Sequence, residues 1–147
     1  MVRAHLLLAG LRVQGPREEE LELEARSAMT ILIDLPYPPT LNSMYRNVVI
    51  GGFARTLLSK AARAYKQSVA DVCTAERIKP LAGPVELRLV AYRPSKRGDL
   101  DGVLKALCDA LQGYCYENDN QIVCIMAWRR DDKDRPRVEV AVTPFGA

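Results

Sequence analysis

The chain has 147 residues, with 21 Lys and Arg against 18 Asp and Glu, 48% hydrophobic residues and a formal net charge of +3. This length corresponds to one domain, and no apolar run approaches the ~20 residues that a membrane-spanning helix needs. The only histidine is His5, so histidine-ligated zinc sites and nucleophiles activated by a histidine base are not expected. Any catalysis is therefore expected to use carboxylates, lysine or a metal ion.

The four cysteines are Cys73, Cys108, Cys115 and Cys124, and none forms the two-residue spacing of a zinc knuckle or a redox-active pair. We interpret them as reduced thiols, because an unpaired cysteine is commonly buried as a small hydrophobic residue. The N-terminal segment lacks the cleavage site of a secretory signal. We therefore expect the protein in a reducing compartment, the cytoplasm.

The organisation of the chain changes at Met29. Before it, five glutamates cluster between residues 18 and 24, after a Gly15-Pro16 break. We expect residues 1–28 to be a poorly structured extension or to lie upstream of a true start at Met29, with a short docking helix as the alternative. Residues 29–147 are expected to form the domain.

From residue 29 onward, apolar periodicities and turn residues alternate along the chain. Alternating or β-branched segments predict strands, apolar residues at three- and four-residue intervals predict two helices, and Gly51-Gly52 predicts a small hairpin. The expected elements are a strand at 30–35, a hairpin at 47–53, a helix at 59–77, a strand at 85–92, a helix at 100–112, and strands at 121–128 and 137–142. This order indicates a small α/β (α+β) single domain with a mixed sheet and two main helices. We expect the last two strands to pair as a hairpin.

The second helix carries charged residues along one ridge. At about 100° per residue, Asp101, Lys105 and Asp109 form a row beside the apolar stripe, and Asp99 immediately precedes the helix. Close carboxylates repel one another, and a hard divalent cation such as Mg²⁺ or Mn²⁺ removes that conflict. The spacing therefore suggests a metal site.

Asp119, in the turn after this helix, is the best candidate for a third carboxylate, and Glu117 is its competitor. A structural interpretation is also open. Asp99 can be a helix cap, the acid-base-acid row can be a set of solvated pairs, and Asp119 can be an ordinary turn residue.

Two separated segments resemble the motifs of one family. Asp99-Leu100-Asp101, Lys105, Asp109-Ala110-Leu111 and Asn118-Asp119-Asn120-Gln121 resemble the core motif of the RusA-type Holliday junction resolvases, and LPYPPTLNSMYR at 35–46 resembles their proline-rich opening. The motifs occur in the same order, and the similarity covers about residues 29–142. The resemblance implies a homodimer with a mixed α/β fold, of a kind common in phages and prophages.

The resemblance also implies that Asp99, Asp101 and Asp119 bind the catalytic metal and that Lys105 is needed for cleavage. Mg²⁺ is the expected metal, with Mn²⁺ as the alternative. The expected activity is that of a crossover junction endodeoxyribonuclease, which resolves four-way DNA junctions by paired symmetrical nicks in recombination and repair. A two-fold dimer would match the symmetry of the junction. Neither a membrane nor a nucleotide cofactor is expected.

Basic residues around these motifs are candidates for contacts with DNA phosphates, although each can also be a solvated surface charge. The candidates are Arg97, Lys96, Arg93, Arg46, Arg55, Lys60 and Arg63. Aromatic residues make up only 6% of the chain, and we expect Trp128 and Tyr92 in a core or an interface. Recognition is therefore expected to depend on junction shape and backbone charge.

Three other functions stay open. A nuclease for other branched DNA, such as flaps or forks, would use the same catalytic residues. A non-catalytic DNA-binding or phage structural module would keep the fold without turnover. A glycosyltransferase with a DxD motif would need a nucleotide-binding domain, for which this chain leaves little room.

Overall fold

The computed structural model describes residues 29–96 and 99–146. For residues 41–42, within the first of these ranges, it describes the backbone only. The expected N-terminal extension and the candidate Arg97 lie outside the described residues. Among the helices that are described, none is both long and apolar enough to span a membrane.

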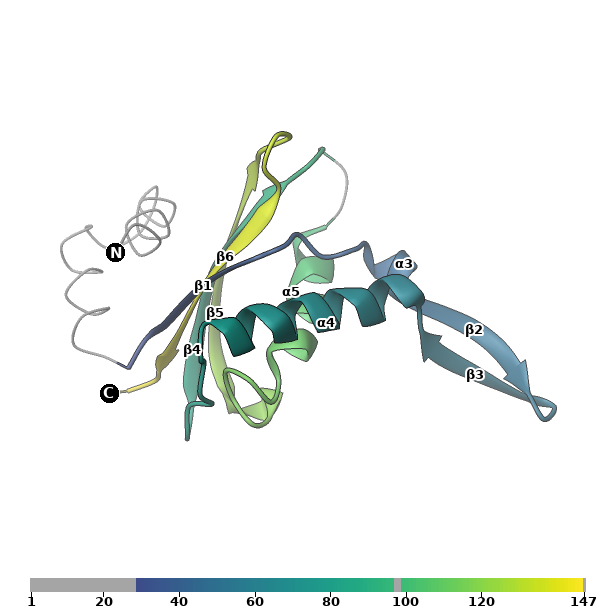
Figure 1. The fold of residues 1–147 in the computed structure, drawn as a ribbon, viewed down its shortest axis with the longest axis horizontal. Helices are drawn as coiled ribbons and strands as arrows, with labels where there is room; N and C mark the ends of the chain where they lie inside the picture. The colour runs from purple at the N-terminus through teal and green to yellow at the C-terminus, as the bar shows by residue number, and fades with distance from the viewer. Residues whose placement is uncertain (1–28, 97–98, 147) are drawn as a thin grey trace.

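The centre of the fold is a four-stranded mixed sheet with the order β1-β6-β4-β5 (Figure 1). Strand β1 (Ile31–Leu35) is antiparallel to β6 (Arg137–Pro144), which is antiparallel to β4 (Val85–Arg93). Strand β4 is parallel to β5 (Ile122–Asp131), and β1 and β5 are the two edge strands. The expected α+β domain with a mixed sheet and two main helices is confirmed.

Helix α4 (Lys60–Ala75) packs on one face of this sheet (Figure 1). Its start is set by Ser59, whose Oγ accepts a hydrogen bond from the Ala62 N–H at 3.1 Å, as expected for a serine N-cap. The helix buries Ala62, Tyr65, Val69 and Cys73. This is the apolar stripe that the three- and four-residue spacing predicts.

Helix α5 (Leu100–Leu111) connects the parallel strands β4 and β5 and lies on the same face of the sheet (Figure 1). Its buried residues are Val103, Ala106, Leu107, Ala110 and Leu111. The two alanines extend the buried face toward α4 and the chain before it, since short side chains let neighbouring backbones approach closely. The charged row is consequently left on the outer side of the helix.

The prediction that the last two strands pair as a hairpin is wrong. Strand β4 lies between β5 and β6, so that Leu87 is paired with Ile125 on one side and with Val142 on the other. A crossover helix is what a parallel β4–β5 pair requires, and α5 supplies it. Strand β4 also buries residues on both faces, Leu89 toward the helices and Val90 on the opposite side, which suits a central position.

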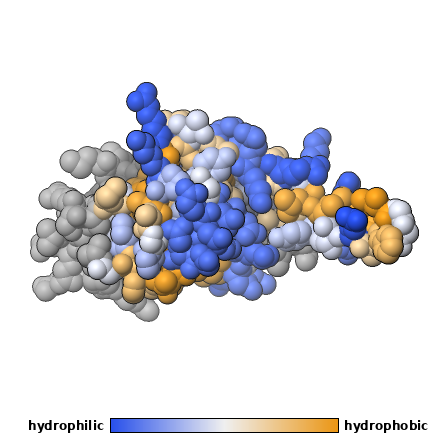
Figure 2. All heavy atoms as spheres, turned by 90° about the horizontal axis from the view of Figure 1, so that it is seen from below, coloured by the Kyte–Doolittle hydropathy of each residue, from blue (hydrophilic) through white to orange (hydrophobic). Residues whose placement is uncertain are grey.

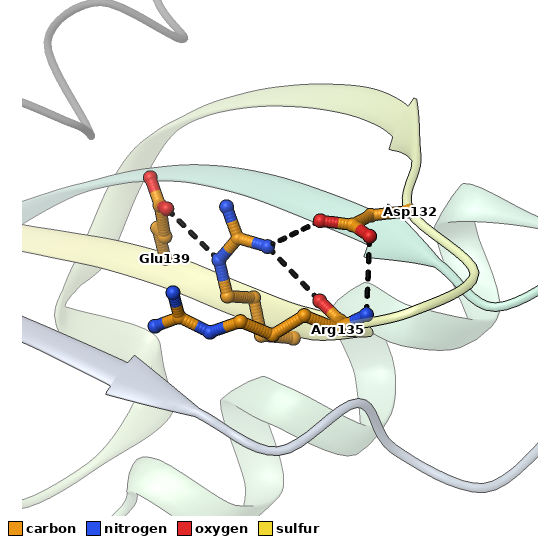
Figure 3. A network of polar contacts seen from close by, with 4 residues as sticks. Asp132, Arg135 and Glu139 are labelled. Atoms are coloured by element: carbon orange, nitrogen blue, oxygen red, sulfur yellow. Dashed lines mark hydrogen bonds and ion pairs between the residues drawn. The ribbon is translucent and has the colours of Figure 1, made fainter.

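The turn between β5 and β6 is held by charges. Arg137 donates through Nη1 to Asp132 Oδ2 and to the Arg135 carbonyl, both at 2.9 Å, and through Nε to Glu139 Oε1 at 3.1 Å (Figure 3). Its guanidinium lies 3.8 Å from the centroid of the Tyr92 ring on β4. One arginine thus connects the turn, β6 and β4.

A second, two-stranded sheet extends away from the body (Figure 1). It consists of β2 (Tyr45–Ile50) and β3 (Phe53–Leu58), and it follows the short helix α3 (Leu41–Met44). We call this hairpin, residues 45–58, the arm. The hairpin around Gly51-Gly52 is confirmed, and it is longer than the sequence pattern indicates.

Candidate active site

The connection from β4 to α5 presents two carboxylates to solvent. Asp99 occupies the N-cap position with extended backbone angles of φ −96° and ψ 145°, but its side chain accepts no capping hydrogen bond. Asp101 lies in the first turn of α5, and both residues are exposed. The positive end of the helix dipole favours negative charge at this point. Asp99 thus occupies the cap position that the structural interpretation assigns to it, but its side chain does not cap the helix by a hydrogen bond.

The next charged residues on α5 form an ion pair. Lys105 Nζ lies 3.9 Å from Asp109 Oδ2, and the Lys105 side chain is 55% exposed. This is the solvated i,i+4 pair that the structural interpretation predicts. Such a pair is worth only about 0.3–0.5 kcal/mol, so Lys105 can leave it at little cost.

Asp119 begins the 3-10 helix η2 (Asp119–Gln121), which follows α5 and precedes β5. The preceding Asn118 accepts a hydrogen bond from the Asn120 N–H at 3.0 Å, and the Asn118 N–H donates to Gln121 Oε1 at 3.0 Å. This reciprocal capping box fixes the local backbone and leaves the Asp119 side chain exposed.

Two glutamines connect this turn to the rest of the fold. Gln112 Oε1, at the end of α5, accepts from the Asp119 N–H at 3.2 Å. Gln121 Nε2 donates to the carbonyls of Leu81 at 2.9 Å and Gly83 at 2.8 Å. Sequence reasoning did not select either glutamine, although the Asn-x-x-Gln spacing at 118–121 is itself a cap signal.

The electrostatics show which part of α5 faces Asp119. Burial, with smaller contributions from the charges of Asp109 and Asp119, raises the pKa of the Cys108 thiol to about 11. Burial mainly raises the pKa of Tyr116, with contributions from the same two carboxylates. Together with the hydrogen bond from the Asp119 N–H to Gln112, this places Asp119 near the C-terminal half of α5.

The three predicted metal ligands offer the carboxylate oxygens that a divalent cation prefers, but their side chains are not grouped around one point. In residues 29–96 and 99–146, no three His, Cys, Asp or Glu side chains lie close enough to hold one metal ion. Across the same residues, the carboxylates of Asp99, Asp101 and Asp119 enter no hydrogen bond or ion pair. Carboxylates repel one another when no cation is present. The donor set is thus all oxygen and unengaged, with two members at the start of α5 and the third in η2.

Arg93, one of the candidate phosphate contacts, is engaged within the protein. It is buried at the end of β4, donates through Nε to Asp131 Oδ1 at 2.8 Å and through Nη1 to the Lys96 carbonyl at 3.1 Å. The guanidinium beside Asp131 lowers the pKa of that carboxyl. Arg93 therefore positions the loop that carries the exposed Lys96, and its role as a phosphate contact stays a prediction.

The other described basic candidates lie on the arm and on the start of α4. Arg46, Arg55, Lys60 and Arg63 are exposed. Arg63 donates through Nη1 to the Leu58 carbonyl at 3.0 Å, at the base of the arm. The structure thus brings these four residues to one end of the molecule.

Comparison with known proteins shows the family of this chain. Residues 36–143 match the family model described as Endodeoxyribonuclease RusA, and the match includes the arm, both main helices and the Asp119 turn. The match identifies an endonuclease, an enzyme that cuts a DNA strand at an internal position. This protein belongs to the RusA family, which confirms the resemblance seen in its motifs.

Individual relatives are similar over most of their length. The chain is 32% identical over 120 residues to the crossover junction endodeoxyribonuclease RusA of Enterobacteria phage 82, covering 80% of this chain and 97% of that protein. The same values hold for the protein of that name from Escherichia coli K12. The Shigella sonnei protein is 31% identical over the same shares. The phage relative agrees with the expected relation to phages.

Proposed function

We propose that this chain is a metal-dependent endonuclease that resolves four-way DNA junctions by paired symmetrical nicks. The observation that carries the proposal is the RusA family match over residues 36–143. Relatives named crossover junction endodeoxyribonucleases cover 80% of the chain and support the same substrate.

Asp99, Asp101 and Asp119 are the proposed metal ligands, with Mg²⁺ expected and Mn²⁺ as the alternative. Their support is the exposed, unengaged state of all three carboxylates within the described residues. Exposed side chains change rotamer at little cost, so attraction to a cation can draw them together. When bound, the cation supplies Lewis-acid stabilisation of the charge that develops on a phosphoryl oxygen.

Lys105 is the proposed partner of the scissile phosphate. Lys105 follows Asp101 by four residues on α5, and its pair with Asp109 at 3.9 Å is weak. Moving from Asp109 to a phosphate oxygen exchanges one anion for another. Lys105 can therefore offset the negative charge of the transition state without a change in the fold.

Phosphate contacts are proposed for Lys96, for Arg97, which precedes Asp99 by two residues in the sequence, and for Arg46 and Arg55 on the arm and Lys60 and Arg63 at the start of α4. We further propose that two copies of the chain act as a two-fold dimer, because a junction offers two equivalent strands for nicking. All four cysteines are free thiols, which supports a cytoplasmic location for this enzyme.

The test compares a mobile four-way junction, a fork and a linear duplex as substrates, with Mg²⁺ and then with EDTA. Wild-type protein and Asp71→Asn, a control at an exposed acid on α4, should nick the junction symmetrically, and only with metal. Asp101→Asn should bind the junction but nick it at least about 100-fold more slowly. Equal cutting of the duplex would contradict junction resolution and leave the endonuclease. Equal turnover by Asp101→Asn would contradict the proposed site.

A further inference from the structure

The tip of the arm exposes large apolar side chains. Ile50 is 51% exposed and Phe53 is 71% exposed, and Val49 beside them is more exposed still. Figure 2 shows this apolar surface at the far end of the arm, interrupted by hydrophilic atoms. Contiguous exposed apolar surface on a projecting element usually marks an interaction site.

The strand register places apolar and basic residues on one face of the arm. Ile50 is paired with Phe53, and Val48 is paired with Arg55. Because side chains alternate along a strand, Arg46 lies on the same face as Val48 and Ile50. This face, which we call the arm face, therefore has an apolar tip and two arginines behind it.

The charge of the arm face is not balanced within the arm. No acidic residue occurs between positions 45 and 58. Within the part of the chain that the structure describes, neither Arg46 nor Arg55 takes part in an ion pair. A surface of this kind suits a polyanion that also offers apolar faces. It does not suit a second arm, which would bring like charges together.

The turn keeps the apolar pair at the outermost point. Gly51 and Gly52 have φ angles of 59° and 83°, the left-handed conformations that a two-residue hairpin turn requires. Such a tight turn holds Ile50 and Phe53 directly opposite each other. The strands are six residues long, so the tip stands roughly 20 Å from the base of the arm.

The base of the arm is fixed to the helix that carries the candidate active site. Met44, Ala62 and Ala106 form one buried cluster, and Ala106 directly follows Lys105. The Ser59 N–H donates to the Met44 carbonyl at 2.8 Å, and the Ser59 hydroxyl donates to the Ser43 carbonyl. The arm is thus attached to α5 beside the proposed catalytic lysine.

We propose that the arm inserts Ile50 and Phe53 between bases at the branch point of DNA, while Arg46 and Arg55 bind the flanking phosphates. The proposal rests on the proposed function and adds how the branch is recognised. Apolar wedges that enter a base step partly unstack it, and at a branch point continuous stacking is already interrupted. The arm then places the branch at a fixed position relative to α5.

The experiment uses a four-way junction with 2-aminopurine next to the branch point, and EDTA to prevent cleavage. Fluorescence and affinity are measured for wild-type protein, Phe53→Ser and Phe145→Ser. Phe145 is the matched control, because it is 52% exposed and lies at the other end of the chain. Both substitutions remove an exposed phenyl group, so both proteins should fold, which circular dichroism and thermal unfolding can verify.

Wild-type protein and Phe145→Ser should raise the fluorescence at the branch point. Phe53→Ser should lose this rise and bind the junction roughly tenfold more weakly, the loss typical of one base–aromatic contact. Equal fluorescence and affinity for the two variants would overturn the proposal. So would an unchanged affinity of Phe53→Ser combined with a smaller oligomer in sedimentation, which would assign the tip to a second copy.

Failure of this proposal is distinguishable from failure of the proposed function. Nicking of an unlabelled junction by wild-type protein with Mg²⁺ is measured in parallel. If wild-type protein nicks the junction but Phe53→Ser behaves like Phe145→Ser, only the proposal for the arm is contradicted. If wild-type protein does not nick the junction, the proposed resolvase activity itself is contradicted.

Discussion

Lys105 Nζ lies 3.9 Å from Asp109 Oδ2, one turn further along α5. The pair joins the proposed catalytic lysine to an acid that is not a proposed ligand. Either Lys105 serves to neutralise Asp109, or Asp109 holds Lys105 until a phosphate replaces it. The two roles differ in which substitution affects chemistry.

If Lys105 acts on the phosphate, Lys105→Gln should slow single-turnover nicking about 100-fold, the usual loss for one charge-stabilising donor. Junction affinity should fall by only about threefold, because one of several phosphate contacts is lost. Asp109→Asn should leave nicking nearly unchanged and alter the free energy of unfolding by no more than about 0.5 kcal/mol. Equal losses in the two variants would indicate that the pair itself is what matters.

Metal binding to Asp99, Asp101 and Asp119 should increase the free energy of unfolding. Without a cation these carboxylates gain nothing from proximity, whereas a ligand that binds only the folded state stabilises it. At a hundredfold excess over its dissociation constant, Mg²⁺ or Mn²⁺ should add about 2.7 kcal/mol to the free energy of unfolding. Thermal or chemical unfolding with and without metal measures this.

Asp99→Asn, Asp101→Asn and Asp119→Asn should each remove most of that gain. Glu117→Gln is the control, since Glu117 is an exposed acid two residues before Asp119. A loss of the gain in Glu117→Gln, with none in Asp119→Asn, would assign the third ligand to the competitor.

Local signals predicted most of the elements. Ser59 marks the start of α4, the prolines at 36, 38 and 39 end β1, and Gly51-Gly52 marks the turn of the arm. Each signal acts within a few residues, so it can be recognised without the tertiary structure.

Strand pairing could not be predicted in this way. In β6, Glu139 alternates with Val138 and Val140, which is typical of a strand with one solvated face. In the structure Glu139 is only 1% exposed, and β6 lies between β1 and β4. Burial of Glu139 depends on Arg137, and the pattern of apolar residues contains no sign of that pairing.

The candidate site was likewise predictable where it depends on local sequence, and not where it depends on distant contacts. The apolar periodicity places Asp99 immediately before the second helix, and in the structure Asp99 is the N-cap residue of α5. The position of Asp119 depends on the contacts of Gln112 and Gln121 with distant backbone, which no local pattern reveals. The spacing therefore could not tell which part of α5 Asp119 faces.

Burial of Glu139 predicts a pH effect on stability. Desolvation raises the pKa of its carboxyl despite the hydrogen bond from Arg137, and its Oε2 has no hydrogen-bond partner within the described residues. A raised pKa means that the folded state disfavours the charge. The contribution of this group is fully present below its unfolded pKa and is lost as pH rises through its folded pKa.

Glu139→Gln should therefore be more stable than wild type at neutral pH and equal to it in acid. Denaturant unfolding at several pH values measures the difference. Asp131 and Asp132, whose pKa values are lowered, act in the opposite direction, but they are present in both proteins and cancel. A variant that is less stable at neutral pH would show that the contact with Arg137 outweighs desolvation.

Cys108 can report the position of Asp119 in solution. Its pKa of about 11 results from burial and from the charges of Asp109 and Asp119, so the thiol should be alkylated slowly at neutral pH. Asp119→Asn removes one of these charges and should shift the pH profile of Cys108 alkylation toward lower pH. Asp99→Asn should leave the profile unchanged, because Asp99 lies at the far end of α5. Mass spectrometry of the Cys108 peptide, with Cys124 as an internal reference, gives both rates. Identical profiles for wild type and Asp119→Asn would mean that the turn carries Asp119 away from the second half of α5, and a shift in Asp99→Asn would mean that the acids already lie together.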